Sequence, residues 1–164
     1  MRIHIIFATY SSATQSTAEY IASISVARGH TCKLILVGDV HATDLSEADF
    51  LIFGSPSWER DNFKYNGQPH FDFFPFFKKY GYDLDSASKS STLDLHQAPC
   101  AVFGLGDKNY PVFCGAVDIL ADFLSLSHGQ VMPNRLRIDE YYFHTSSAQE
   151  SIRIWLDEVL VSPK

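Results

Sequence analysis

Residues 3–14, which read IHIIFATYSSAT, give the clearest indication of the fold. Its first half, Ile3 to Ala8, is almost wholly apolar and rich in β-branched isoleucine, which predicts a buried strand. Its second half, Thr9 to Thr14, carries four aliphatic hydroxyl groups and no charged side chain. Helical periodicity follows between Ala18 and Ala22. We therefore expect a strand, a hydroxyl-rich loop and a helix in that order.

The hydroxyl-rich loop has the chemistry of a phosphate-binding site. The first turn of a helix exposes unpaired backbone N–H groups and a partial positive charge, so amides and hydroxyls can hold a phosphate there without lysine or arginine. The loop lacks both the P-loop motif and the G-x-G-x-x-G dinucleotide motif. Serine and threonine are also favoured simply as helix caps. The loop by itself leaves both interpretations open.

Five short apolar runs predict five strands, and helical segments lie between them. Near-continuous apolarity, without alternation, indicates strands that are covered on both faces, as in a parallel sheet flanked by helices. The expected strands are Ile3–Ala8, Thr31–Val37, Phe50–Gly54, Cys100–Gly104 and the region 131–138, and the expected helices lie around 18–22, 44–48, 71–80, 116–124 and 152–159. The alternation predicts an α/β fold with a doubly wound sheet and a ligand crevice at the carboxyl ends of the strands.

Composition limits the kind of protein. The chain of 164 residues can bury one substantial core, so we treat 1–164 as a single domain. Its net charge of -6 argues against affinity for nucleic acid. No apolar run approaches the roughly 18 to 20 residues that cross a bilayer, and the N-terminus lacks the pattern of a secretion signal. We expect a cytoplasmic monomer without a membrane partner.

Cysteine and histidine give no sign of a metal site. Cys32, Cys100 and Cys114 show no C-x-x-C spacing, so we expect reduced and mostly buried thiols. The seven histidines show no metal-binding spacing, and we expect most of them on the surface.

Two connections are longer than usual. Glu59 to His70 follows the third expected strand and lies beside the expected crevice, so we interpret it as either functional or mobile. For Gly81 to Gln97 we expect a tolerated surface insertion.

Two further segments end at an aromatic residue beside the crevice. Gly54 to Trp58 follows the third expected strand, and Gly104 to Tyr110 follows the fourth. Large aromatic faces on either side of a gap can enclose a planar ring, while the small residues near them let backbone groups approach its polar edge. Together with the hydroxyl-rich loop, these segments predict a site for a planar ring with a phosphate tail.

The chain resembles the short-chain flavodoxins from its first strand through Trp155. The first loop is similar to the family's phosphate signature, Ser/Thr-x-Ser/Thr-Gly-x-Thr, with Thr9, Ser11 and Thr14 at the hydroxyl positions. The segments that end at Trp58 and Tyr110 resemble the loops whose aromatic side chains pack on the two faces of the flavin ring. Residues 113–118 and 136–139 continue the likeness.

The resemblance implies a five-stranded parallel sheet of order 2-1-3-4-5 with helices on both faces and FMN at the switch point. It implies a low-potential carrier that passes single electrons between a basic reductase and an acceptor enzyme. No catalytic acid, base, nucleophile or metal is implied. The cofactor-binding residues that it implies are Thr9, Tyr10, Ser11, Ser12, Ala13, Thr14, Ser55, Pro56, Ser57, Trp58, Glu59, Gly104, Leu105, Gly106, Asp107, Asn109, Tyr110, Phe113 and Cys114.

Two positions depart from the family pattern. Ser12 stands where the phosphate loop usually has glycine, which adds strain if this position has a positive φ. Glu59 also stands where short-chain members often have glycine. In the family, the peptide at this position flips when the flavin takes up one electron and a proton. A side chain there is expected to make the flip costlier. Together with Asp61 and Asp107, Glu59 would place negative charge near the ring and lower its potential.

Two alternatives share this fold. A quinone-type reductase would need a substrate pocket above the ring and a route for nicotinamide, for which we find no sequence feature. An activator dedicated to one metalloenzyme would use the aromatic segment Asn62 to Phe77 as its docking surface.

Overall fold

Residues 3–14 form a strand, a loop and the start of a helix, as their pattern predicts. The computed structural model describes residues 1–58 and 67–160. In chain order the elements are β1 (Arg2–Phe7), α1 (Ala13–Ala27), β2 (Thr31–Leu36), the 3-10 turn η1 (Val37–Asp39), α2 (Ala42–Ser46), β3 (Phe50–Trp58), β4 (Gln68–Pro69), α3 (Phe73–Lys79), β5 (Pro99–Gly106), α4 (Ala116–Leu126), β6 (Gln130–Val131), β7 (Leu136–Asp139) and α5 (Thr145–Val159).

The sheet has the strand order β2-β1-β3-β5-β6, with β7 also beside β5. All pairs among these strands are parallel. Because β6 and β7 together take the place of a fifth strand, the implied order 2-1-3-4-5 is confirmed. Parallel strands that share one direction bring their carboxyl ends to the same edge of the sheet, which is where the site lies.

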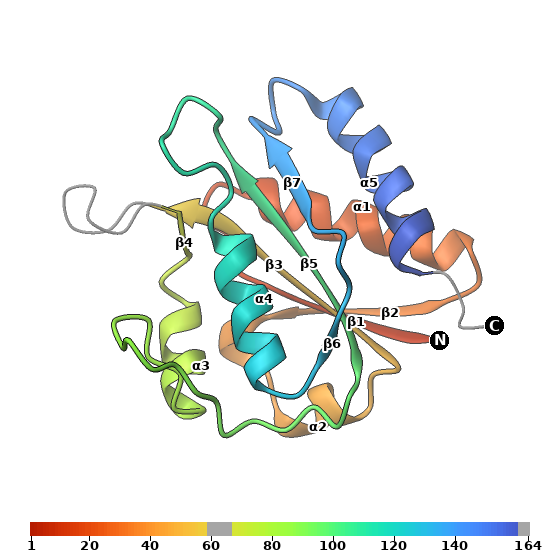
Figure 1. The fold of residues 1–164 in the computed structure, drawn as a ribbon. Coiled ribbons are helices and arrows are strands. Elements are labelled where there is room, and N and C mark those ends of the chain that lie inside the picture. Colours follow the sequence, from red (N-terminus) through yellow and green to blue (C-terminus); the bar gives the residue numbers. More distant parts are fainter. Residues whose placement is uncertain (59–66, 161–164) are drawn as a thin grey trace.

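Helices cover both faces of the sheet, as expected (Figure 1). On one face α1 and α5 pack through residues such as Ile21 and Leu156 against Ile3 and Ile52. On the other face α3 and α4 contribute aromatic side chains, among them Phe77 and Phe123 at a centroid distance of 5.0 Å. Each such side chain stabilises the fold by about 1.5–3 kcal/mol through burial.

Two expected loops are strands in the structure. Gly54 to Trp58 was expected to leave the sheet, but β3 continues through it because Ser55 and Pro56 pair with the end of β5. Residues 104–106 likewise belong to β5, which pairs there with β7. Only from Asp107 onward does the chain form a loop. The prediction ended both strands at a glycine, and here glycine instead allows close packing inside the sheet.

The fifth strand is divided. β6 pairs with the start of β5 and β7 with its end, and Pro133 lies between them. Proline has no N–H to donate to a sheet, which accounts for the interruption. The short β4 pairs antiparallel with Ser57 and Trp58, so the sheet also has one antiparallel member that the sequence did not predict.

Two helix boundaries differ from the prediction. The short helix expected at 44–48 is α2, which begins at Ala42, because the backbone N–H of His41 donates to the Asp44 carboxylate at 2.8 Å and so starts the helix. The aromatic helix expected at 71–80 is the shorter α3, Phe73–Lys79.

The long connection from Gly81 to Gln97 is packed against α4. The Tyr82 hydroxyl donates to Asp122 at 2.8 Å, and the Leu95 N–H donates to the Ser127 carbonyl at 2.8 Å. Tyr82 and Leu95 are both buried. Most of the segment is exposed, as expected of a surface insertion, but Tyr82 and Leu95 contribute to the core, which was not predicted. Of the other long connection, residues 59–66 lie outside the described residues.

The titratable side chains follow their expected distribution with two exceptions. All three cysteines are free, and Cys100 and Cys114 are buried. His4 and His70 are buried, unlike the surface histidines that were expected. Within residues 1–58 and 67–160, no group of three or more His, Cys, Asp or Glu side chains is placed to hold a metal ion. None of the helices described is long and apolar enough to span a bilayer.

Candidate functional site

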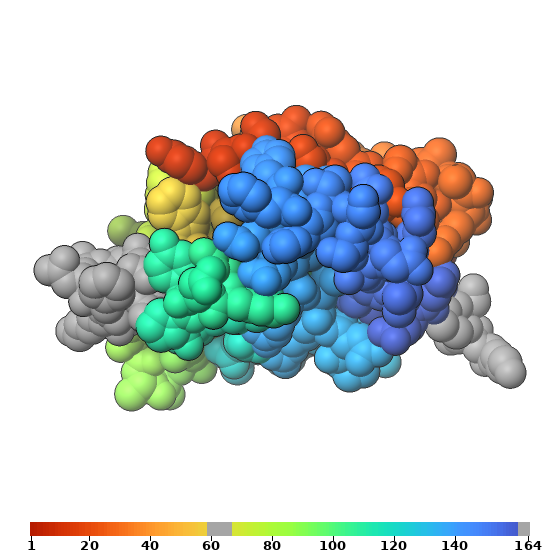
Figure 2. All heavy atoms as spheres, turned by 90° about the horizontal axis from the view of Figure 1, so that it is seen from above, coloured from red at the N-terminus to blue at the C-terminus, as the bar shows by residue number. Residues whose placement is uncertain are grey.

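A cavity of about 480 Å³ opens where the carboxyl ends of β1, β3, β5 and β7 meet. Ligand pockets in proteins commonly measure about 300–1,000 Å³. Figure 2 looks down on this end of the molecule, where the chain near residue 10 (red), the end of β3 (yellow), the loop after β5 (green) and the turn after β7 (blue) come together. The lining residues are Tyr10, Ser11, Ala13, Thr14, Pro56, Ser57, Trp58, Gly67, Leu105, Gly106, Asp107, Tyr110, Val112, Glu140, Tyr141, Tyr142 and Phe143.

The first wall is the hydroxyl-rich loop before α1. Ser12 is the N-cap residue of α1 and has a φ of 65°, so serine occupies a left-handed position here. Its side chain makes no capping hydrogen bond, and the first turn of α1 has no acidic residue. The Thr9 hydroxyl is buried without a hydrogen-bond partner among the described residues. The helix end therefore offers N–H donors to an anion, and the Thr9 hydroxyl is left free by the described residues to accept a partner.

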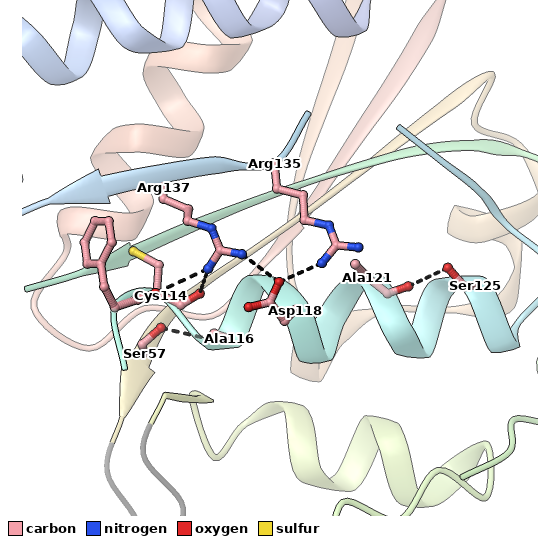
Figure 3. Close-up of polar contacts among 9 residues, drawn as sticks. Ser57, Cys114, Ala116, Asp118, Ala121, Ser125, Arg135 and Arg137 are labelled. Atoms are coloured by element: carbon pink, nitrogen blue, oxygen red, sulfur yellow. Dashed lines mark hydrogen bonds and ion pairs between the residues drawn. The ribbon is translucent and has the colours of Figure 1, made fainter. Parts of the chain in front are cut away.

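The second wall is the end of β3. The Trp58 ring meets the Tyr10 ring edge-on, with centroids 4.8 Å apart and planes at 83°. The Ser57 hydroxyl accepts a hydrogen bond of 3.2 Å from the N–H of Ala116 at the start of α4 (Figure 3). Ser55, in contrast, is buried and accepts a hydrogen bond from the His70 N–H at 2.8 Å. Ser55 therefore stabilises this wall through its hydrogen bond to His70 and is not among the residues that line the cavity.

The third wall is the loop after β5. The N–H of Asn109 donates to the Asp107 carboxylate at 2.7 Å, and the Tyr110 N–H donates to the Asp107 carbonyl at 3.1 Å. These bonds form a tight turn that leaves the Tyr110 ring half-exposed at the cavity mouth. A Cβ on Gly106 would lie 3.0 Å from the Cys114 backbone nitrogen, so glycine allows the two ends of the loop to approach.

Cys114 closes this loop inside the protein. It is fully buried, and its φ of 53° turns the chain sharply toward α4. Burial raises the pKa of its thiol to about 12, so the group stays protonated and unreactive. The Arg137 side chain, from β7, donates to the carbonyl oxygens of Phe113 and Cys114 at 3.3 and 3.0 Å and also binds Asp118 (Figure 3). Arg137 thus holds the end of this loop in place.

The structure brings most of the expected site residues to one cavity. Those that line it are Tyr10, Ser11, Ala13, Thr14, Pro56, Ser57, Trp58, Leu105, Gly106, Asp107 and Tyr110. Those that are not among the lining residues are Thr9, Ser12, Ser55, Gly104, Asn109, Phe113 and Cys114, and Glu59 lies outside the described residues, as does Asp61. Their contact with a ligand stays a prediction.

The cavity has a fourth wall, which was not predicted from the sequence. The turn between β7 and α5 contributes Glu140, Tyr141, Tyr142 and Phe143, and Gly67 and Val112 complete the lining. A signal for this turn was present, because three consecutive aromatic residues begin three positions after the end of the last expected strand. The rule that ligands bind at the carboxyl ends of parallel strands applies to that strand as it does to the others.

The charge around the cavity is negative. Among the described lining residues the charged side chains are those of Asp107 and Glu140, and none is a lysine or arginine. The nearby Lys108 lies 3.7 Å from Asp139, which offsets its charge. An anionic group bound in this cavity would consequently depend on backbone and hydroxyl donors.

Comparison with known proteins decides the family. A family model described as flavodoxin matches residues 5–155. The chain belongs to the flavodoxin family. The protein accordingly binds FMN and transfers electrons.

Individual flavodoxins are similar to the chain over most of its length. A flavodoxin of Maridesulfovibrio salexigens is 29% identical over 136 residues, which cover 82% of this chain and 84% of that protein. Oxidised flavodoxin 2 of Bacillus cereus has a TM-score of 0.73 at 26% identity, with 96% of this chain and 99% of that chain covered. A Fusobacterium nucleatum flavodoxin mutant bound to flavin mononucleotide has the same TM-score, 0.73, at 16% identity, with 96% and 94% covered.

The cavity of this flavodoxin fits FMN. The α1 N-terminus lacks a side-chain cap, and in the loop that leads to it the buried Thr9 hydroxyl lacks a partner among the described residues. Leaving a buried hydroxyl unpaired costs about 1–3 kcal/mol, which a phosphate oxygen nearby would offset. The aromatic and small apolar residues of the other walls suit a planar ring.

Proposed function

We propose that the protein is a low-potential one-electron carrier that holds FMN in this cavity, with the phosphate at the start of α1 and the ring between Trp58 and Tyr110. One observation carries the proposal: an uncapped helix N-terminus and two aromatic side chains, one from the end of β3 and one from the loop after β5, open onto the same cavity. The proposed contacts include those expected residues that line the cavity, together with Thr9.

The chain's residues bind the cofactor and tune it. Bound FMN supplies the redox chemistry at its ring. The amides of the first loop and the hydroxyls of Ser11 and Thr14 hold the phosphate. Trp58 and Tyr110 exclude water from the ring faces, and Asp107 and Glu140 place negative charge at the cavity. Negative charge next to a group that gains electrons makes the gain less favourable, so the potential falls.

The partners we propose are a basic reductase and an electron-accepting enzyme. The cavity mouth carries exposed aromatic side chains, of which Phe143 is 82% exposed and Tyr110 is 53% exposed. The net charge of -6 favours partners with a basic docking face. Such complementarity speeds association more than it strengthens the complex, which suits a carrier that has to leave one partner for another.

We propose a monomer that works in the cytoplasm. A carrier needs an open cavity mouth, which self-association through the aromatic rim would cover. The three free cysteines agree with a reducing compartment. Size-exclusion chromatography with light scattering tests the first part, since a dimer would contradict it.

Visible absorption of the purified protein tests the proposal. We expect flavin bands, or their appearance after addition of FMN, with one FMN per chain. A colourless protein that does not take up FMN would contradict it. Replacing Tyr110 by alanine should weaken FMN binding by about 1 kcal/mol or more, because stacking contributes that order of energy. Tyr110→Phe retains the ring and serves as the control.

Turnover distinguishes a carrier from an enzyme. The carrier should oxidise NAD(P)H only when a separate reductase is added. Steady oxidation of NAD(P)H by the protein alone, with a quinone as acceptor, would instead identify a reductase. Stimulation of one metalloenzyme only would identify a dedicated activator.

A further inference from the structure

The turn between β7 and α5 is bonded to the phosphate loop. The Tyr142 hydroxyl donates a hydrogen bond of 2.6 Å to the backbone carbonyl of Ser11, although the two residues are 131 positions apart in the chain. Tyr142 lines the cavity, and its ring packs against that of the buried Tyr141 at 5.6 Å. Packing against Tyr141 therefore holds the Tyr142 ring in place, with its hydroxyl directed at the loop before α1.

The same turn is anchored to the end of β5 and the loop that follows. The Glu140 N–H donates to the Gly106 carbonyl at 2.9 Å, and the Asp139 carboxylate accepts from the Lys108 N–H at 3.0 Å. Residues 139–142 thus link the loop that carries Tyr110 to the loop before α1. A hydrogen bond from such an anchored turn can hold a neighbouring loop in one conformation.

The loop before α1 needs such support. Ser12 has a φ of 65°, a region that residues other than glycine occupy at a cost of roughly 1–2 kcal/mol. Because the peptide group is planar and trans, the direction of the Ser11 carbonyl also fixes the direction of the Ser12 N–H, which points the opposite way. Because the Ser11 carbonyl points to the Tyr142 hydroxyl, the Ser12 N–H is directed away from Tyr142.

We propose that Tyr142 is a positioning residue, which holds the peptide between Ser11 and Ser12 so that its N–H binds the cofactor's phosphate. The inference rests on the proposed function, which places the phosphate at this loop. It adds a specific consequence: Tyr142 contributes to the preference for a phosphorylated flavin over an unphosphorylated one. A residue that only stabilised the fold would affect both flavins alike.

The test compares FMN with riboflavin. Tyr142→Phe removes the hydroxyl and retains the ring. Flavin fluorescence quenching by the flavin-free full chain gives both dissociation constants. We expect FMN to bind about 3- to 10-fold more weakly to the variant, the change that loss of one hydrogen bond produces, while riboflavin affinity changes by less than about 2-fold. Tyr80→Phe, which removes a hydroxyl from a residue outside the cavity lining, should leave both constants unchanged.

Two results would overturn the inference. Equal weakening of FMN and riboflavin would mean that Tyr142 acts on the ring or on the fold as a whole. Unchanged FMN affinity would mean that the hydrogen bond does not orient the loop. Failure of the wild-type protein to bind FMN at all would refute the proposed function instead, so the two failures are distinguishable.

Discussion

The Nη1 atom of Arg137 lies 3.0 Å from the carbonyl oxygen of Cys114, to which it donates a hydrogen bond (Figure 3). Cys114 has a left-handed backbone, and it ends the loop that carries Asp107 and Tyr110. Arg137 also forms an ion pair with Asp118 at 2.6 Å on the first turn of α4. One side chain from β7 therefore joins the end of the loop to the helix that follows it.

Replacing Arg137 by lysine should destabilise the protein by about 1–2 kcal/mol, because an ammonium group cannot make the forked set of hydrogen bonds that guanidinium makes. Urea denaturation measures this. Arg135→Lys is the matched control, since Arg135 is more exposed and its side chain donates a hydrogen bond to Asp118, as Arg137 does, without the contacts to the loop carbonyls. Equal losses in the two variants would contradict the role of the carbonyl contacts.

Ser12→Gly should raise the free energy of unfolding by about 0.5–1 kcal/mol, because glycine adopts a positive φ without the steric cost that serine meets. The same change at Ser23, in the exposed middle of α1, should lower it by about 0.5–1 kcal/mol. Chemical denaturation of the two variants checks the opposite signs. A loss of stability in Ser12→Gly would show that the left-handed position is not strained.

Asp107→Asn should raise the midpoint potential of bound FMN. The amide oxygen retains an acceptor for the Asn109 N–H while the charge is removed. Removing one unit charge from the lining of a partly solvated cavity changes the energy of an added electron by on the order of 0.7 kcal/mol, or about 30 mV for one electron. Potentiometric titration at low salt measures the shift. Asp39→Asn, which lies outside the cavity lining, should not change the potential, and an equal rise in both variants would rule out a local effect.

His70 should make stability depend on pH. Burial lowers the pKa of His70, because the charged imidazolium loses its hydration. At a pH below the unfolded pKa of about 6.5 the unfolded state therefore binds more protons, and stability falls as pH decreases through this region. Urea denaturation should be measured between about pH 5.5 and 7.5, on both sides of the unfolded pKa of about 6.5. The free energy of unfolding should depend less on pH in His70→Gln than in the wild type.

The control for His70 is His96→Gln, which changes an imidazole whose side chain is 83% exposed. Its profile should match that of the wild type. If His70→Gln kept the full pH dependence, a different group would have to carry it.

Local sequence patterns were enough to predict the class of fold and the place of the cavity. Apolar runs without alternation can be buried only between two layers of helices, and parallel strands collect their ends at one edge. The loop from Thr9 to Thr14 and the aromatic residues Trp58 and Tyr110 could be assigned to that edge from these local patterns. The family resemblance then supplied the cofactor.

The groups that complete the site could be identified only from contacts between distant parts of the chain. Whether Gly54 and Gly104 end their strands depends on pairing across the sheet, and the local pattern carries no information about the partner strand. The local pattern also does not reveal that the Tyr142 hydroxyl bonds to the Ser11 carbonyl, 131 positions away in the chain. Nor does it reveal that Arg137, on the neighbouring strand β7, donates to the carbonyl of Cys114 at the end of the loop after β5. These contacts arise from the way β7 packs beside β5, because chain folding brings together groups that no local spacing connects.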